Sequence, residues 1–297
     1  MKSEIIKKLG KPFIVLKNAY NGFNDNNVIK LSASLAYFTL FSLPPLLVIL
    51  ITITGSIFGK EAVRGELFFE IRNLVGAQAA IQIQEIVKNI ELQQHTGLIT
   101  AFSFIILAFG ASGIFSEIQS SLHLIWEIEP GQNKGFWHQV QNKLLSLSMI
   151  GSLSFLLMVS LFINSILDIA GNYLFAYFKD SKVILLFIIN NVIVFLVVSV
   201  LFLLIYKTLP RKRLRWKYIY NASLFTSGLF MIGKYLISWY LSSSKLVSVY
   251  GAAGTLIILL IWVYYSAIIL YFGAELAKAN AIYNNDYETV RDKPQSK

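Results

Sequence analysis

Long apolar runs, separated by short polar and charged stretches, constrain this 297-residue chain more than any other feature. A helix that crosses a membrane needs about 20 predominantly apolar residues, and six runs are long enough. They lie at residues 28–58, 98–126, 144–170, 183–206, 218–241 and 252–277. The runs are continuous and lack the period-two alternation of membrane strands. We therefore predict an all-α, polytopic membrane protein, a bundle of about six transmembrane helices.

The composition agrees with a lipid environment. Hydrophobic residues make up 56% of the chain and charged residues only 14%, whereas soluble domains average about 25% charged residues. The net charge is +10, but the basic residues lie mostly beside apolar runs. Anionic lipid headgroups explain such a distribution better than nucleic acid does. We expect membrane lipids, and no nucleic acid, as partners.

The distribution of Lys and Arg predicts the orientation. If the runs cross alternately, 18 of the 26 Lys and Arg fall on the side of both termini and seven on the other side. Cytoplasmic loops carry the excess of these residues, so both termini are expected in the cytoplasm. The predicted parts are a cytoplasmic N-terminal segment, 1–27, a transmembrane domain, 28–279, and a flexible cytoplasmic tail, 280–297.

The segment between the first two runs, residues 59–97, is too polar to span but has apolar residues at helical spacing. Phe68, Ile71 and Val75 form one set, and Ile83 begins another beyond Gly76. This spacing predicts an amphipathic helical hairpin on the extracytoplasmic surface. The hairpin is either a lid over an opening or an element that simply packs on the spans.

The first run combines hydroxyl side chains with two prolines. Ser34, Tyr37 and Ser42 precede Pro44 and Pro45. Each proline removes a backbone donor, so we expect a kink just before the pair. One interpretation is a discontinuous helix that lines a substrate path. The other is a helix that lies flat before the prolines and a short span after them.

Ionisable residues inside the runs are candidates for a polar pathway or for ion pairs. Glu117 and Ser121 share one helix face, and Glu275 lies in the last run. At about 1.5 Å per residue, Asp168 and Lys234 fall in the outer half of the membrane, and Glu117 and Glu275 in the inner half. This depth allows a Lys234–Asp168 pair but not a Lys234–Glu275 pair. Glu117 could instead form a structural pair at the boundary, and Lys234 could extend to the surface alone.

The loop between the fourth and fifth runs holds the densest basic cluster. Its members are Arg211, Lys212, Arg213, Arg215 and Lys217. The cluster could face anionic headgroups, act only as a determinant of topology, or bind RNA. No aromatic RNA-binding pattern accompanies it.

Motifs for catalysis are missing from the sequence. It contains no cysteine, and its three histidines lack metal-ligand spacing. A P-loop, a nucleophile elbow and an acidic cluster for paired metals are also lacking. We expect neither a metal nor a cofactor, and no enzymatic activity.

Four stretches, in this order and spacing, carry a resemblance to a known family. They are Leu-Ser-Ala-Ser-Leu-Ala-Tyr-Phe-Thr-Leu-Phe-Ser-Leu-Pro-Pro at 31–45, Gly-Ala-Ser-Gly-Ile-Phe at 110–115 with Leu-His-Leu-Ile-Trp at 122–126, Tyr-Lys-Thr-Leu-Pro at 206–210, and Val-Tyr-Gly-Ala-Ala-Gly at 249–254 with Gly-Ala-Glu-Leu at 273–276. Over residues 15–280 the chain resembles the YihY / virulence factor BrkB family of bacterial inner-membrane proteins.

The resemblance implies a six-span bundle in the bacterial inner membrane. Members were formerly labelled ribonuclease BN in error, so ribonuclease activity is not expected. The functions associated with the family include envelope maintenance, serum resistance and transport of lipid-like or other solutes. We expect a transporter of a lipid-like or other small solute, with a non-transporting scaffold for envelope integrity as the alternative.

Overall fold

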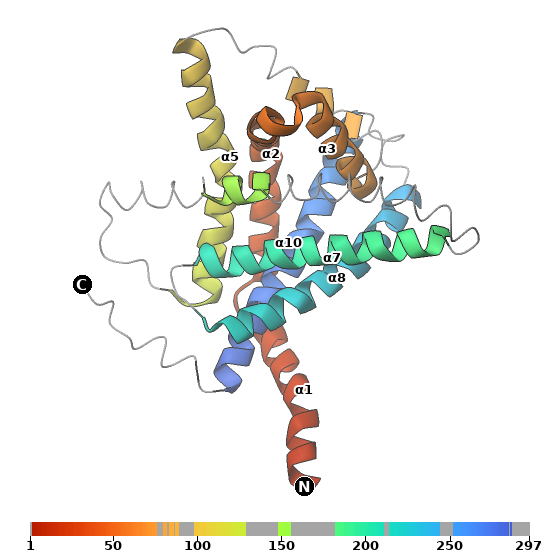
Figure 1. The fold of residues 1–297 in the computed structure, drawn as a ribbon. Helices are drawn as coiled ribbons and strands as arrows, with labels where there is room; N and C mark the ends of the chain where they lie inside the picture. Colours follow the sequence, from red (N-terminus) through yellow and green to blue (C-terminus); the bar gives the residue numbers. More distant parts are fainter. Residues whose placement is uncertain are drawn as a thin grey trace.

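The computed structural model describes most of the chain. The described residues are 2–75, 80–81, 83–85, 87–88, 98–128, 148–155, 182–210, 214–243, 252–284 and 286. Apart from turns and short connections, they are helical and contain no strand. Seven helices have described bounds: α1 (Lys2–Asp25), α2 (Val28–Phe58), α3 (Lys60–Val75), α5 (Leu98–Ile125), α7 (Lys182–Thr208), α8 (Trp216–Ser243) and α10 (Ala252–Tyr283). Figure 1 shows their arrangement.

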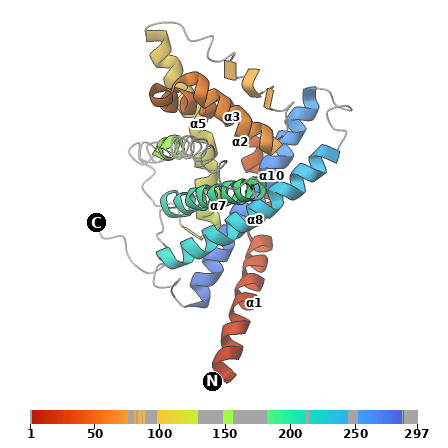
Figure 2. The same ribbon diagram turned by 45° about the vertical axis from the view of Figure 1, so that its right-hand side comes forward.

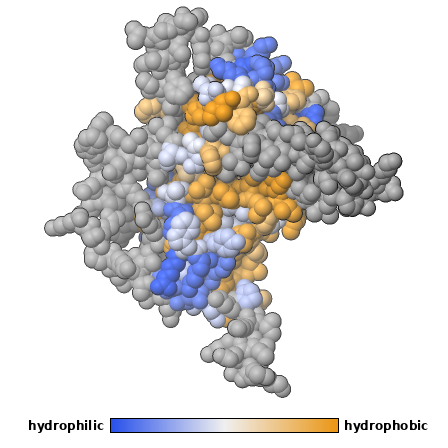
Figure 3. Space-filling model, in the orientation of Figure 1, coloured by the Kyte–Doolittle hydropathy of each residue, from blue (hydrophilic) through white to orange (hydrophobic). Residues whose placement is uncertain are grey.

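The helices confirm the predicted all-α membrane protein. Among the described residues, three stretches are long and apolar enough to cross a membrane: Val28–Phe58, Asn191–Thr208 and Leu256–Tyr283. On the face in Figure 3, hydrophobic residues occupy the middle, and hydrophilic residues gather near α3 and toward the end where α1 lies. The number of six spans stays a prediction, because only residues 148–155 of the run at 144–170 are described.

Helix α2 runs through both prolines without a break in its helical assignment. Pro44 and Pro45 lie inside a 31-residue helix, so the discontinuous helix, one of the two interpretations, is wrong, whereas the kink expected just before the pair stays a prediction. The helix begins after Asn27, whose backbone is left-handed at φ 50°, and ends at Gly59, with φ 85°. These two positive-φ residues separate α2 from α1 and from α3.

Small residues of α5 allow it to pack closely against the proline region of α2. A methyl group added at Gly110 would lie 3.2 Å from Pro45 Cγ, and one added at Gly113 would lie 2.6 Å from Ser42 Oγ. As the residue number rises along α5, it falls along α2, so the two helices are antiparallel. The tight contact follows from the absence of side chains at the two glycines.

Helix α10 lies at the centre of the described bundle and contacts α1, α2, α5 and α8. Figure 2 shows α8 and α10 side by side. Thr226 of α8 lies against Gly273, and Tyr265 of α10 lies against Gly233, so these helices are also antiparallel. The indole N–H of Trp126, which follows α5, donates to the backbone oxygen of Ala274 at 3.0 Å.

Both ends of the bundle carry an additional helix. Helix α3 packs on α2, so a helix is present where the first one of the hairpin was predicted, and the described residues between 80 and 88 are also helical. That the hairpin is amphipathic and extracytoplasmic stays a prediction. Helix α1 extends away from the other helices in both ribbon views (Figures 1 and 2). Its Val15 and Ala19 pack with Ala279 of α10. The N-terminal segment is therefore a docked helix, which the sequence pattern did not indicate.

We predict that Gly113→Leu destabilises the protein in detergent by about 1–3 kcal/mol, because the added side chain would meet Ser42. Gly228→Leu is the matched control, since an added methyl group at Gly228 would meet no atom within 4 Å. Thermal unfolding followed by size-exclusion chromatography measures both variants. Equal melting temperatures for the two variants would contradict the close α2–α5 contact.

Candidate functional site

Most hydroxyl side chains of the described helices are satisfied by their own helix. Thr39 Oγ1 donates to the oxygen of Leu35 at 2.7 Å, Ser199 Oγ to Phe195 at 2.7 Å and Thr226 Oγ1 to Ala222 at 2.6 Å. Ser154, Ser223, Ser227 and Ser266 make the same bond to the residue four positions earlier. A bilayer offers no water to such groups, so the backbone is their most accessible partner.

Three buried hydroxyls form no hydrogen bond of ordinary geometry. They are Ser32 Oγ, Ser121 Oγ and Tyr271 Oη, within the described part of the chain. The indole N–H of Trp262 is the fourth such buried atom. An unsatisfied buried polar group costs about 1–3 kcal/mol, so the three hydroxyls mark a site where the fold does not complete its own hydrogen bonding.

The three hydroxyls come from three helices and lie at one level of the bundle. Ser42 lies opposite Gly113 in the antiparallel α2–α5 pair, which places Ser32 level with the residues around Ser121. The Tyr271 hydroxyl of α10 lies within hydrogen-bonding reach of Ser121, although the two form no bond of ordinary geometry, and the half-buried Glu117 is close enough to act on it electrostatically. We call Ser32, Ser121, Tyr271 and Glu117 the inner polar site.

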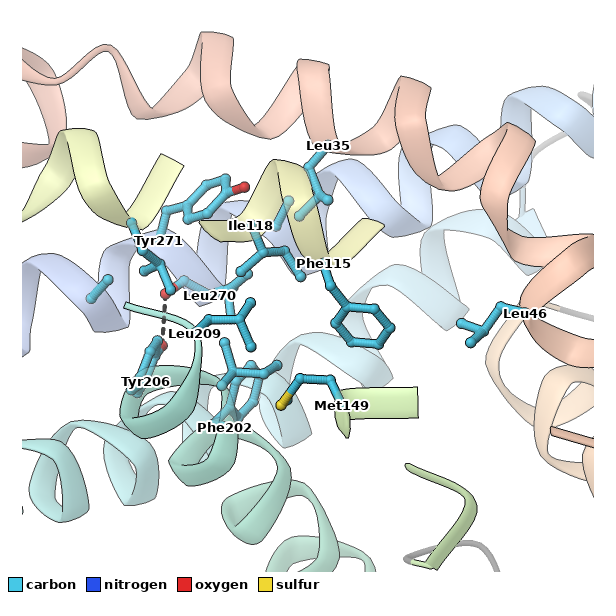
Figure 4. Packing of buried hydrophobic residues seen from close by; sticks show 14 of the residues in the cluster. Leu35, Leu46, Phe115, Ile118, Met149, Phe202, Tyr206, Leu209, Leu270 and Tyr271 are labelled. Carbon is cyan, nitrogen blue, oxygen red and sulfur yellow. Dashed lines mark hydrogen bonds between the residues drawn. The ribbon is translucent and has the colours of Figure 1, made fainter. Parts of the chain in front are cut away.

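Tyr206 of α7 lies near this site, but its buried hydroxyl does form hydrogen bonds. Its hydroxyl donates to the backbone oxygen of Leu270 at 2.6 Å and lies 3.3 Å from Thr226 Oγ1. The contact is possible because Gly273 leaves room for both side chains. In Figure 4 the Tyr206 hydroxyl meets Leu270, whereas the Tyr271 ring points away from Tyr206, toward Leu35 of α2.

A second polar cluster joins α10 to α1 and to the end of α5. The carboxylate of Glu275, only 2% exposed, accepts a hydrogen bond from Asn26 Nδ2 at 2.6 Å and lies directly against Gly22. One turn later, Lys278 Nζ lies 2.9 Å from Glu127 Oε1. Glu275 therefore has a structural role at the junction of α1, α2 and α10.

The structure does not gather all the residues singled out in the sequence. Ser42 faces Gly113, and Ser34 is half-buried. Tyr37 is 60% exposed, and its ring contacts Phe41 edge-on, outside the inner polar site. Asp168 lies outside the described residues, so the predicted Lys234–Asp168 pair stays a prediction.

Lys234 and Glu275 lie at different levels of the bundle. Gly233, next to Lys234, contacts Tyr265, about ten residues before Glu275 on α10, which corresponds to about 15 Å along the helix. Within the described chain, Lys234 is half-buried and forms no ion pair.

The basic loop is described only in part, since residues 211–213 lie outside the described residues. Arg215 and Lys217 converge on Asp286, at 3.0 Å and 3.4 Å. The Tyr218 hydroxyl donates to the same carboxylate. This hydrogen bond, followed by the positive charges of Arg215 and Lys217, lowers the pKa of Asp286. These contacts connect Asp286, which lies shortly after the end of α10, to the start of α8.

A cavity of about 530 Å³ lies at the other end of α2, beneath α3. Leu47 and Ile51 of α2 line it, together with α3 and the helical residues between 80 and 88. The packing of α3 on α2 therefore leaves an opening between the predicted hairpin and the bundle. A smaller, wholly apolar cavity of about 170 Å³ separates α2 and α5 from α7.

No group of three His, Asp or Glu side chains in the described ranges is placed to hold a metal ion. The sequence did not indicate Tyr271 or the Asn26–Glu275 contact, and it offered Ser32 only as one of several hydroxyl residues of the first run. Their residue types are common in apolar helices, so only the absence or presence of a partner in space distinguishes them.

Comparison with known proteins connects the chain to a membrane protein family. The family described as virulence factor BrkB matches residues 19–297. A Bacillus subtilis protein, YfkH, named as ribonuclease-like, is 25% identical over 88% of this chain and 93% of its own length. A UPF0761 membrane protein of Haemophilus influenzae is 26% identical over 86% of this chain and 90% of its own. A UPF0761 membrane protein of Pseudoalteromonas atlantica is 24% identical over 99% of this chain and 97% of its own length. No solved structure matches the chain significantly.

We predict opposite effects for two buried tyrosines. Tyr206→Phe loses the bond to Leu270 and is expected to cost about 1 kcal/mol of unfolding free energy. Tyr271→Phe removes a hydroxyl whose contact with Ser121 lacks ordinary hydrogen-bond geometry, so it is expected to be neutral or slightly stabilising. Thermal unfolding of both variants in one detergent checks this. A clear loss of stability in Tyr271→Phe would show that its hydroxyl is satisfied.

The lowered pKa of Asp286 predicts that the stability of the fold depends on pH. Because its folded pKa lies below the ordinary 3.8, its ionised form stabilises the fold above that pH, and the contribution disappears as the pH falls through the lowered value. Wild type is therefore expected to melt above Asp286→Asn at pH 6, with the difference shrinking below about pH 4. A difference in melting temperature that is constant from pH 6 to pH 3 would contradict this assignment.

Proposed function

The chain belongs to the virulence factor BrkB family of membrane proteins, and from that premise we propose that it is a transporter of a lipid-like or other small solute. The observation that carries the proposal is the inner polar site, where three buried hydroxyls from α2, α5 and α10 form no hydrogen bond of ordinary geometry with the described part of the chain. A polar solute or the water around it would supply the missing hydrogen bonds. The half-buried carboxylate of Glu117 adds a charge beside them.

The cavity beneath α3 and the inner polar site both lie along helix α2. Leu47 lines the cavity beneath α3, and Ser32 belongs to the inner polar site. Their separation of 15 positions corresponds to about 22 Å along α2, most of the roughly 30 Å hydrocarbon core. A solute that entered beneath α3 would therefore need to follow α2 to reach Ser32.

We place the protein in the bacterial inner membrane with both termini in the cytoplasm. The supporting argument is the excess of Lys and Arg on the side of the termini. This orientation puts the inner polar site in the cytoplasmic half and the cavity beneath α3 outside. Anionic headgroups at the cytoplasmic face would then meet the exposed Arg215 and Lys217.

A scaffold for envelope integrity is the second candidate, and the close packing of α2 against α5 favours it. Gly110 and Gly113 bring the two helices together between the cavity and the inner polar site. In a scaffold this contact would never open. In a transporter it would have to separate during each cycle, so a disulfide placed across the contact distinguishes the two candidates.

Flux assays in reconstituted liposomes test the transport proposal. We expect Glu117→Gln and Tyr271→Phe each to lower the flux of a fluorescent lipid or amphiphile at least tenfold without loss of stability. Lys234→Met tests a further ionisable residue of the predicted spans, one at the opposite level of the membrane from Glu117. Tyr220→Phe, at an exposed tyrosine of α8, is the control and should keep wild-type flux. Unchanged flux in both the Glu117 and Tyr271 variants would refute the inner polar site as a pathway.

A further inference from the structure

The cavity beneath α3 has the size and the lining of a binding site for an amphiphile. Its volume of about 530 Å³ lies within the range of small-molecule pockets, about 300–1,000 Å³. Leu47 and Ile51 of α2 form an apolar floor, and Leu67, Phe68 and Val87 continue it on the facing segments. These side chains would cover an apolar chain on several sides.

The polar lining of the cavity carries both signs of charge. On α3, Arg64 Nη1 lies 2.5 Å from Glu61 Oε1. Glu85 and Lys88, both exposed, supply the second acid and the second base from the facing segment. The two acids and two bases of the described lining leave no net charge among these residues, so a purely anionic or cationic head would meet as many like charges as opposite ones there. A head with both signs can pair with both.

We propose that this cavity binds a zwitterionic, single-chain amphiphile of the lysophospholipid class. The apolar chain lies on Leu47, Ile51 and Phe68. The phosphate pairs with Arg64 and Lys88, and the ammonium group pairs with Glu61 and Glu85. This inference rests on the proposed function in one respect: it takes the bound amphiphile to be the transported solute. Binding at the cavity does not itself require transport.

Photolabelling of the full chain in phosphatidylglycerol nanodiscs tests the site, because such a bilayer contains no competing zwitterionic lipid. The probe is a lysophosphatidylcholine with a photoreactive acyl chain. Labelled peptides are expected to include residues 47–51, 64–68 and 80–88. Leu67→Trp, which fills the cavity, should lower labelling at least tenfold. Leu196→Trp, on an exposed position of α7, should label like wild type.

A charge variant keeps the test valid if Leu67→Trp does not fold. Lys88 is exposed, so Lys88→Glu should preserve the fold while it lowers labelling by the zwitterion at least fivefold. An excess of alkylphosphocholine should compete in wild type, whereas a fatty acid or an alkyltrimethylammonium ion of equal chain length should compete at least fivefold less well. Equal competition by all three, or undiminished labelling of Lys88→Glu, would overturn the proposed ligand class.

Binding and flux separate this inference from the proposed function. Specific labelling without flux in liposomes would refute transport and leave the binding site standing. Flux that persists in Leu67→Trp and Lys88→Glu, with labelling absent from the cavity in wild type, would refute the binding site and leave transport standing.

Discussion

The lack of water inside a bilayer is the constraint on which the rest of this structure depends. Each polar atom of a membrane helix must find a partner in the protein. Most hydroxyls of the described spans bond to the preceding turn, and larger side chains bond to a neighbouring helix. Trp126 and Tyr206 both donate to backbone oxygens of α10, four residues apart. Helix packing and hydrogen bonding thus meet at α10, and the few unpaired atoms beside it stand out.

The membrane class and most helices could be predicted from the sequence because hydropathy is a local signal. The first predicted run, 28–58, coincides with α2, and the pattern in the following loop indicated α3. The prolines lie inside a continuous helix, so of the two interpretations of this run the discontinuous helix is excluded, and the expected kink stays a prediction. The contact between Gly110 and Pro45 illustrates the neighbouring packing, which a local rule does not include. Helix α10 also continues to Tyr283, beyond the apolar run that predicted it.

The candidate site was only partly predictable, because it depends on partners that are distant in the sequence. Glu117 and Ser121 were found as polar residues within an apolar run. Tyr271 and Ser32 look like many other residues of such runs, and only the lack of a well-formed hydrogen bond within the described chain sets them apart. In the same way, no local pattern indicates that Gly22 must be small because Glu275 lies against it.

The contact between Asn26 and Glu275 sets an order of assembly. The two residues are 249 positions apart, and a ribosome adds about 5–20 residues per second, so α1 waits about 12–50 s for its partner. During that interval Val15 and Ala19 lack the surface of α10 that later covers them. Helix α1, made long before α10, is thus among the last of the described helices to be secured, and a chain interrupted before residue 275 would never dock it.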